Sequence, residues 1–274
     1  MAMDEAQFES LLQDLAAETA DLTATVASLS DAQWQLATPA EGWDVHDQVS
    51  HLAIFDEVAA LGFSDPDAFA VTSATMLTTG SDWVDQANDT LHALAPAELI
   101  DRLENSRSSV LRIFREVGPG ARTAWFGPPM SAASSATARL METWAHGQDI
   151  YDAVGIAHPP SDRVRHVCHL GVITRRFAFA LNGLPAPTED VRVQLIAPSG
   201  AIWSWGAASS MSRVTGTAED FALVVTQRRH PADTALLATP GVGQNWMSIA
   251  QTFAGAVGTR RAAGQFAPRQ TAAK

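Results

Sequence analysis

The sequence predicts an α+β protein, in which an N-terminal helical bundle is followed by a small α+β domain. Two observations predict this class. Apolar residues recur every three or four positions through the first two-thirds of the 274-residue chain, as on one face of a helix. Beyond residues 182–187 the period changes to two, as in strands. We therefore assign residues 1–184 to the bundle and 185–260 to the α+β domain, and we expect the aperiodic tail at 261–274 to be mobile.

The helices of the bundle follow from periodicity and from their start and stop signals. The first is predicted at about residues 4–29, where apolar side chains form a single stripe. The second begins after Asp44, a natural N-cap, and runs to about Phe63, just before Asp65 and Pro66. Pro96 suits the first position of a later helix. The remaining helices are expected at residues 67–92, 96–117, 133–154 and 161–182.

The second domain is predicted to contain a hairpin and two helices. Val191, Val193 and Leu195 alternate with polar residues, and a Pro-Ser-Gly turn precedes a second short run at 201–205. Residues 212–215 predict a third strand. The closing helices are expected at residues 218–229 and 244–253.

Charge and composition exclude several classes of function. The 30 acidic residues outnumber the 18 basic ones, and the formal net charge of −12 disfavours binding to nucleic acid or to anionic membranes. No apolar run approaches the roughly 18 residues of a membrane span, and the acidic start does not resemble a signal peptide. A single cysteine allows no internal disulfide, so we expect a cytoplasmic protein.

Two other groups of residues have competing interpretations. Cys168 lies between His166 and His169, which could form a second metal cluster or an activated nucleophile, but a buried structural cysteine is favoured because no acidic partner is near in sequence. Several tryptophans could line a pocket, although core packing is favoured for them. These are Trp83, Trp125, Trp203, Trp205 and Trp246.

Three residues form a candidate divalent-metal site. Glu142 and His146 are four positions apart and therefore share one helix face. His51 lies on another helix, which an antiparallel bundle could bring alongside. Two imidazoles and one carboxylate suit zinc and leave a fourth position for water or substrate, as in catalytic sites. Asp149 continues the same face one turn further on.

Helical periodicity gives a competing interpretation of this face. The large apolar residues of the 133–154 helix lie opposite Glu142 and His146, so spacing alone favours a solvated face there. His51 shares its side of the earlier helix with Phe55, which indicates a sheltered position, but a lone histidine there is more often a hydrogen-bonded core residue than a ligand. A metal bound by these residues is therefore expected in a groove near the edge of the bundle.

Two segments carry a family resemblance: Gly42-Trp43-Asp44-Val45 with His51-Leu52 and Phe55-Asp56, and Met141-Glu142-Thr143-Trp144-Ala145-His146-Gly147-Gln148-Asp149. They resemble the mycothiol-dependent maleylpyruvate isomerase family, which is part of the DinB-like superfamily of metal-binding four-helix bundles. The resemblance implies a DinB-like bundle in which His51, Glu142 and His146 hold a zinc ion. It also implies a C-terminal domain similar to sterol-carrier folds, so it extends over most of the chain.

The resemblance implies a thiol-dependent reaction. A metal lowers the pKa of a coordinated thiol or water, and mycothiol, as the thiol cosubstrate, could then attack a small electrophile. Reversible addition gives isomerisation, and completed displacement gives S-transfer. Asp149 is a candidate to orient a ligand or substrate group. Family members also use an arginine of the C-terminal domain, for which Arg228 and Arg229 are the candidates.

Two other functions remain open on the sequence. One is a non-catalytic metal- or lipid-binding protein, whose sterol-carrier-like domain holds a hydrophobic ligand. The other is a zinc-dependent hydrolase, in which zinc hydroxide replaces the thiolate. Turnover of electrophilic substrates that requires added thiol distinguishes the thiol-dependent enzyme from both.

Overall fold

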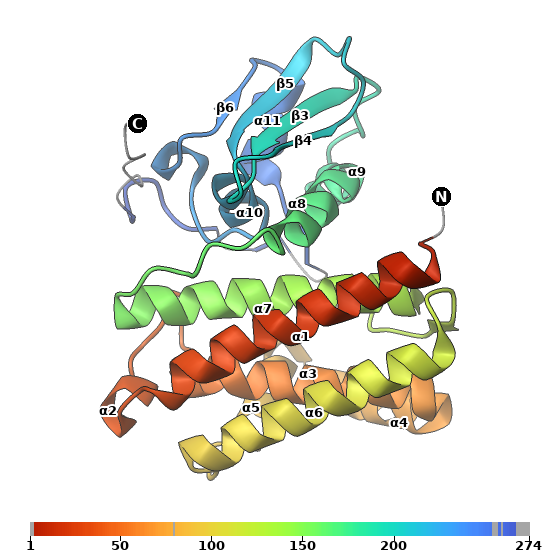
Figure 1. The fold of residues 1–274 in the computed structure, drawn as a ribbon, viewed down its shortest axis with the longest axis vertical. Helices are drawn as coiled ribbons and strands as arrows, with labels where there is room; N and C mark the ends of the chain where they lie inside the picture. Colours follow the sequence, from red (N-terminus) through yellow and green to blue (C-terminus); the bar gives the residue numbers. More distant parts are fainter. Residues whose placement is uncertain (1–2, 79, 254–256, 259, 267–274) are drawn as a thin grey trace. The chain divides into compact units, whose positions relative to one another are not determined.

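The chain divides into two structural units. The computed structural model describes residues 3–78, 80–253, 257–258 and 260–266. Contacts between residues separate a first unit, Met1–Pro159, from a second, Pro160–Lys274 (Figure 1). The first is almost entirely helical, and the second combines helices with a sheet, so the predicted α+β class is confirmed. No helix among the described residues is both long and apolar enough to cross a bilayer.

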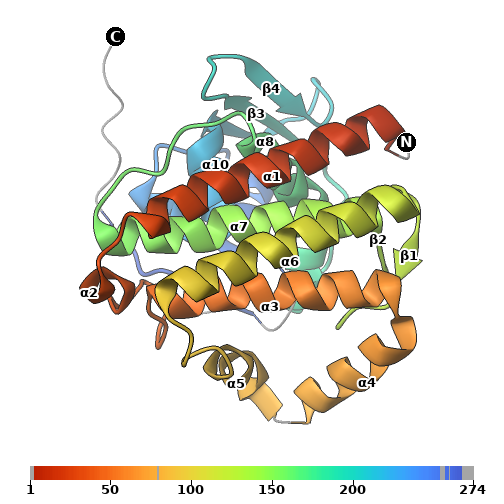
Figure 2. The same cartoon turned by 60° about the horizontal axis from the view of Figure 1, so that its bottom comes forward.

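The first unit is a four-helix bundle. Its long helices are α1 (Glu5–Ala27), α3 (Val45–Ser64), α6 (Pro96–Val117) and α7 (Ala132–Val154). Helices α1 and α3 each pack against both α6 and α7, which closes the ring of four (Figure 2). Shorter elements make the connections, namely α2 (Asp31–Trp34), α4 (Pro66–Leu77), η1 (Gly80–Asp82), α5 (Trp83–Asp89) and the antiparallel pair β1 (Arg122–Thr123) and β2 (Met130–Ser131).

Local sequence signals fix where α3 begins. The Asp44 carboxylate accepts a hydrogen bond from the Asp47 backbone N at 2.9 Å, and the Asp47 carboxylate accepts one from the Asp44 backbone N at 3.0 Å. This reciprocal cap satisfies backbone donors that an open helix end leaves unpaired. The predicted start of the helix after Asp44 is therefore confirmed.

The helix expected at residues 67–92 is interrupted. Helix α4 ends at Leu77 and α5 begins at Trp83. Between them, Gly80 adopts a φ of +79°, a left-handed conformation that an α-helix cannot continue and that glycine adopts most easily. Periodicity continues across this break because both pieces place an apolar side on α3, against which each of them packs.

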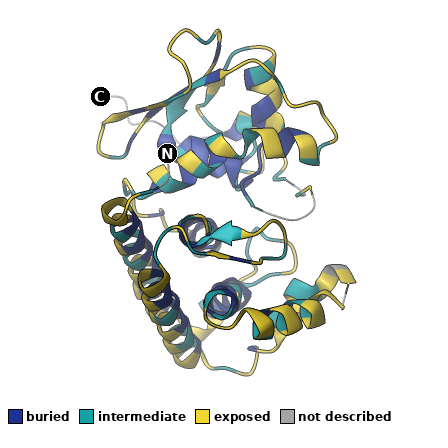
Figure 3. Cartoon of the chain, turned by 90° about the vertical axis from the view of Figure 1, so that its right-hand side faces the viewer, coloured by how far each residue is buried: buried dark blue, intermediate teal, exposed yellow. Residues whose placement is uncertain are grey.

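The bundle interior is apolar along most of its length. Buried residues line the inward faces of the long helices (Figure 3). Val49, Leu52, Leu103 and Ile150 have no exposed surface. Burying each such side chain contributes about 1.5–3 kcal/mol, which makes this packing the main source of stability of the unit.

One buried ion pair crosses this interior. Asp56 of α3 has no exposed surface, and its Oδ2 accepts a hydrogen bond from Nε of Arg107 in α6 at 2.5 Å. Nη2 of Arg107 donates to the Thr143 hydroxyl of α7 at 3.0 Å. A single side chain thus joins three helices. The neighbouring ion pair between Glu57 and Arg102 has an N–O distance of 2.8 Å, but its two side chains are 41 % and 40 % exposed.

The second unit contains a four-stranded sheet with strand order β4-β3-β5-β6. Its strands are β3 (Val191–Ile196), β4 (Ile202–Trp205), β5 (Ser212–Thr217) and β6 (Leu237–Ala238), and its helices are α8 (Val164–Ile173), α9 (Arg175–Leu181), α10 (Ala218–Val225), η2 (Pro231–Asp233) and α11 (Val242–Ile249). The predicted β3–β4 hairpin and the strand at 212–215 are confirmed, and β5 lies parallel to β3. Helices α10 and α11 pack on the sheet.

The boundary between the units differs from the one expected after residue 184. The division lies at Pro159, so α8 and α9 belong to the second unit and not to the bundle. Helix α8 packs closely on α10: a Cβ at Gly171 would lie 2.8 Å from a methyl group of Val225. Periodicity identified an apolar face on these helices, but it does not say which partner covers that face.

Two further expectations for the second unit concern Cys168 and the C-terminal tail. Cys168 is fully buried, its thiol donates to the Ala218 carbonyl at 3.3 Å, and burial raises the pKa of the thiol, which fits the structural role favoured for it. Within the tail expected to be mobile, Gly264 N donates to the Asp233 carboxylate at 2.7 Å. Residues 267–274 of that tail lie outside the described residues.

Substitutions at the adjacent residues Asp56 and Glu57 are expected to differ strongly in their effect on the free energy of unfolding. Asp56→Ala leaves the Arg107 guanidinium buried without its counter-charge, and we expect it to lower the free energy of unfolding by about 3–5 kcal/mol. Glu57→Ala is the matched control, because it removes a half-exposed pair worth about 0–1 kcal/mol. Chemical denaturation of the two variants measures both values. Equal losses would contradict the role given to Asp56.

Candidate metal centre

The bundle brings together the three residues predicted to bind a metal. Nε2 of His51, on α3, lies 3.9 Å from Oε2 of Glu142, on α7, and Nε2 of His146 lies 3.0 Å from the same oxygen. One ligand atom from each of the three lies within 4.8 Å of the others. The three donors come from two helices that pack side by side (Figure 2).

The centre is more sheltered than helical periodicity predicts. The side chains of His51 and Glu142 are 12 % and 18 % exposed, and that of His146 is 9 % exposed. The expectation of a solvated face on α7 is therefore wrong. The polar side of α7 packs against α3, while α1 and α6 also pack on α7, so the helix is buried on polar and apolar sides alike.

A chain of hydrogen bonds orients His146. The Thr38 hydroxyl donates to the Trp43 carbonyl at 2.9 Å, so its oxygen is free to accept from the Gln48 amide nitrogen at 2.8 Å. This fixes the Gln48 amide with its oxygen toward His146, whose Nδ1 donates to it at 2.5 Å. In the neutral imidazole, a proton held on Nδ1 leaves the lone pair on Nε2. That lone pair points toward Glu142.

The surroundings of His146 fit a cation. Its Nδ1 faces the Gln48 amide oxygen, and its Nε2 faces the Glu142 carboxylate. Both neighbours are acceptors, so a neutral imidazole cannot satisfy the two contacts at once. A positive charge at Nε2, either a second proton or a metal ion, resolves this arrangement.

The protonation of the other two residues also suits a metal. Burial lowers the pKa of His51 to about 4, helped by the neighbouring His146, so its imidazole is neutral at neutral pH. Burial opposes ionisation of Glu142, but in the metal-free site the contacts of its carboxylate with His146 and His51, which donate to it when their Nε2 atoms carry a proton, outweigh burial and hold the pKa of the carboxyl well below its ordinary value. Neutral imidazole and ionised carboxylate are the forms that bind zinc.

Aromatic rings enclose the centre. The indole of Trp43 stacks on His146, with ring centroids 5.7 Å apart, and lies 5.2 Å from His51. Its Nε1 donates to the Asp85 carboxylate of α5 at 2.8 Å. On the other side of His51, the Phe55 ring lies 4.4 Å away. These rings exclude bulk water from the histidines and strengthen electrostatic interactions between them and a bound ion.

Of the predicted catalytic residues, Asp149 lies on the same helix as Glu142 and His146, whereas the two arginines lie in the second unit. Asp149 is fully buried on α7, one turn beyond His146, where a carboxylate can orient neighbouring groups. Arg228 and Arg229 follow α10 in the second unit. Arg228 donates to the Thr226 carbonyl at 2.8 Å, and the Arg229 guanidinium lies 3.7 Å from the centre of the Phe266 ring. Their role at the metal centre stays a prediction.

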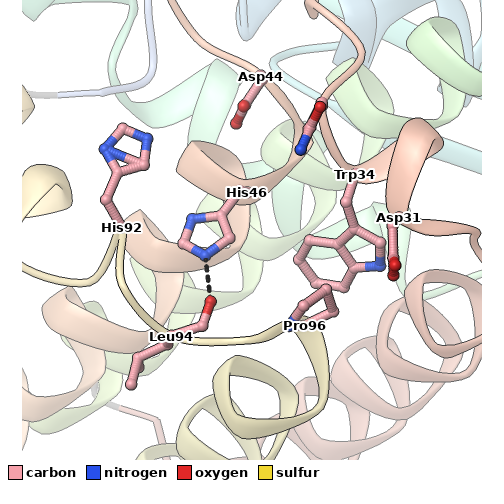
Figure 4. A pocket seen from close by; sticks show the side chains of 8 residues that line it. Asp31, Trp34, Asp44, His46, His92, Leu94 and Pro96 are labelled. Carbon is pink, nitrogen blue, oxygen red and sulfur yellow. Dashed lines mark hydrogen bonds between the residues drawn. The ribbon is translucent and has the colours of Figure 1, made fainter.

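A second cluster of metal-ligand types lies near the start of α3. Ligand atoms of Asp44, Asp47 and His92 also lie within 4.8 Å of one another. They adjoin a pocket of about 460 Å³, in which His46 Nε2 is hydrogen bonded to the Leu94 carbonyl (Figure 4). Both aspartates already cap the helix, and His92 is exposed, so helix capping accounts for this cluster.

Gln48 and Thr38 do not stand out in the sequence as residues of the site. Both contact the candidate ligand His146 directly or through one hydrogen bond, and neither lies on its helix. One signal was available: Gln48 is a polar residue one turn before His51, on the sheltered part of a helix where apolar residues are expected.

Comparison with known proteins agrees with this architecture. Residues 15–151 match the family model of the mycothiol maleylpyruvate isomerase N-terminal domain. Two proteins, from two strains of Mycobacterium tuberculosis and both described as uncharacterized, are 45% identical over 248 residues, which cover 90% of this chain and 96% of theirs.

The fold has counterparts among solved structures. Two crystal structures of the mycothiol-dependent maleylpyruvate isomerase, one of them a histidine-to-alanine mutant, align with a TM-score of 0.55. The alignments cover 81% of this chain and 89% of theirs at 15% identity, a level at which the likeness concerns the fold. With its bundle matched by the family model, the chain belongs to the family of the mycothiol maleylpyruvate isomerase N-terminal domain.

Proposed function

We propose that this protein binds zinc through His51, Glu142 and His146 and uses it to activate mycothiol, or a similar small thiol, toward a small electrophilic substrate. The observation that carries the proposal is the convergence of two imidazole nitrogens on one carboxylate oxygen, at 3.9 and 3.0 Å. Membership of a family named for a mycothiol-dependent isomerase supports the choice of thiol.

The chain's own groups would prepare the site for this chemistry. Gln48 holds the proton on Nδ1 of His146 and presents Nε2 to the ion. Glu142 supplies one negative charge, which leaves the ion and its two neutral imidazoles with a net positive charge for an anion. Zinc bound there would lower the pKa of a coordinated thiol and so supply thiolate at neutral pH. The 18 % exposure of the Glu142 side chain leaves a side from which small molecules can approach.

Isomerisation regenerates the thiol, whereas S-transfer consumes it. In isomerisation, sulfur bonds to one carbon of a conjugated double bond and the π electrons move to the conjugated carbonyl oxygen. Rotation about the resulting single bond and expulsion of the thiolate restore the double bond in the other geometry. In S-transfer, the new carbon–sulfur bond remains and a leaving group departs with its electron pair, or a proton completes the addition.

Metal content tests the ligand set. The purified protein is expected to contain about one zinc ion per chain, and His51→Ala or His146→Ala to reduce that content at least tenfold, because two remaining ligands hold zinc poorly. His92→Ala is the matched control, since it removes a histidine from the other carboxylate cluster. Elemental analysis after dialysis measures all four proteins. Full zinc content in both ligand variants would refute the proposed site.

The Gln48 amide gives a finer test. Gln48→Leu removes the acceptor for Nδ1 of His146 and is expected to weaken zinc binding by about 10–100-fold, as losses of such supporting hydrogen bonds do. Gln35→Leu alters an exposed glutamine and should leave affinity unchanged. Competition with a chromogenic chelator measures both affinities. An unchanged affinity in Gln48→Leu would mean that Gln48 does not orient the ligand.

Thiol dependence separates the candidate activities. With mycothiol and a panel of conjugated electrophiles, we expect turnover that a chelator abolishes and added zinc restores. Turnover without any thiol would instead indicate the hydrolase, and lipid binding without turnover would indicate the carrier. Spectrophotometric detection of isomerised or thiol-linked product measures the activity.

A further inference from the structure

One face of the sheet in the second unit is uncovered. Side chains alternate between the two faces of each strand, and Val193 and Leu195 are buried on the face against which α10 and α11 pack. The opposite face exposes three large apolar side chains, namely Ile196 by 51 %, Ile202 by 58 % and Leu237 by 72 %. Large apolar residues gathered on an exposed face mark an interaction surface.

The strand register places two arginines at one end of this outer face. Arg192 of β3 lies directly opposite Arg213 of β5, and Ile196 lies opposite Ile202 of β4 at the other end. Both arginines donate to backbone carbonyl groups, and neither forms an ion pair with any residue that the structure describes. The four strands contain no acidic residue. Like charges side by side on neighbouring strands destabilise a sheet, and a carboxylate from a partner would remove that repulsion.

Charge is distributed unevenly along the chain. The first 101 residues contain no lysine or arginine. Residues 160–274 contain 12 of the 18 basic residues and only 6 of the 30 acidic ones. The bundle is therefore strongly acidic, whereas the second unit carries a net positive charge. A basic face of the second unit attracts the bundle of another molecule and repels another second unit.

Helix α4 of the bundle has an exposed face with matching properties. It lies outside the ring of four long helices (Figure 2), and among its residues, all of which the structure describes, only Phe69 is buried. The outer face of α4 consists of exposed residues at three- and four-residue spacing: Asp67, Ala70, Val71, Ala74 and Leu77. Val71 and Leu77 are 69 % and 50 % exposed. This face is apolar along most of its length and has a carboxylate at one end.

The two faces are complementary in length as well as in charge. Asp67 and Leu77 are ten positions apart, which is about 15 Å along a helix. Arg192 and Ile196 are four positions apart, which is about 13 Å along a strand. With the Asp67 carboxylate beside the arginines, Leu77 therefore reaches the apolar end of the sheet face. The two alanines between them allow the helix to lie close to the strands.

Other classes of partner match the sheet face less well. Sheets that bind single-stranded RNA stack bases on exposed aromatic rings, but Trp203 of β4 is buried, and Trp205 lies on the same side of that strand as Trp203. An anionic bilayer attracts the second unit but repels the acidic bundle. A second copy of this chain supplies both the apolar side chains and the carboxylate.

We propose that α4 of one molecule docks on the outer face of the β4-β3-β5-β6 sheet of a second molecule. The two surfaces differ from each other, so the contact is head to tail, and a dimer leaves one α4 and one sheet face unoccupied. One helix on a four-stranded sheet is a small interface. Association is therefore weak and detectable at high protein concentration.

Sedimentation of the full-length protein at several concentrations tests the contact. The wild type is expected to associate at submillimolar concentration in low salt and to dissociate in high salt, which screens the charges. Arg213→Glu reverses a charge on the sheet face and should weaken association by about tenfold or more. Arg176→Glu is the matched control, because it reverses an exposed arginine of α9 in the same unit, and it should associate like the wild type.

Mixing two defective variants tests the head-to-tail geometry. Asp67→Asn/Val71→Gln removes the carboxylate and an apolar side chain from α4, and it should also prevent association. A mixture of this variant with Arg213→Glu is nevertheless expected to form a one-to-one dimer, because the first retains the sheet face and the second retains α4. An interface between two identical surfaces would instead persist in one of the two variants.

Four results would overturn the proposal. They are a wild type that stays monomeric in low salt, association that persists in either variant, a mixture that stays monomeric, and equal weakening by Arg176→Glu. Circular dichroism checks that each variant is folded. Arg192→Glu replaces Arg213→Glu if the latter does not fold, since the two arginines lie side by side.

Discussion

The ion pair between Asp56 and Arg107 sets the geometry on which the candidate site depends. Arg107 joins α3 to α6 through Asp56 and to α7 through Thr143. Apolar packing alone tolerates sliding of one helix along another, whereas a buried charge pair has one low-energy register. Asp56 lies just over one turn after His51, and Thr143 directly follows Glu142. The pair therefore fixes which turns of α3 and α7 face each other, and with them the distances between the candidate ligands.

The sequence predicted elements whose signals are local. The cap at Asp44 and the proline at Pro96 mark helix starts by chemistry within a few residues, and both starts agree with the structure. The break at Gly80 and the transfer of α8 to the second unit were missed, because periodicity records an apolar face without its partner. The four-residue spacing of Glu142 and His146 suggested a metal site together with His51, apolar periodicity favoured a solvated face there, and the family resemblance decided between the two.

The reason that spacing failed on α7 is physical. A polar face is normally solvated because burial removes its hydrogen bonds to water. On α7 the polar groups meet partners from α3 and α6 instead: Gln48 for His146 and Arg107 for Thr143. In the sequence of a single helix, a polar face that is buried in this way has the same pattern as a polar face exposed to solvent. The buried face is recognised only when its partner polar face on the neighbouring helix is known, and a single sequence does not reveal that pairing.

The bond between Trp43 and Asp85 has a consequence for access to the centre. The indole covers both histidines, yet the part of the chain that anchors it is α5, a short helix beside the break at Gly80. An exposed hydrogen bond contributes only about 0.5–1.5 kcal/mol, one to three times the thermal energy. Breaking this one bond would therefore free the Nε1 edge of the indole at little energetic cost, while α5 stays packed on α3 and the four long helices stay in register. The four long helices carry the candidate ligands, whereas the cover over the two histidines depends in part on one exposed bond to a short connecting helix.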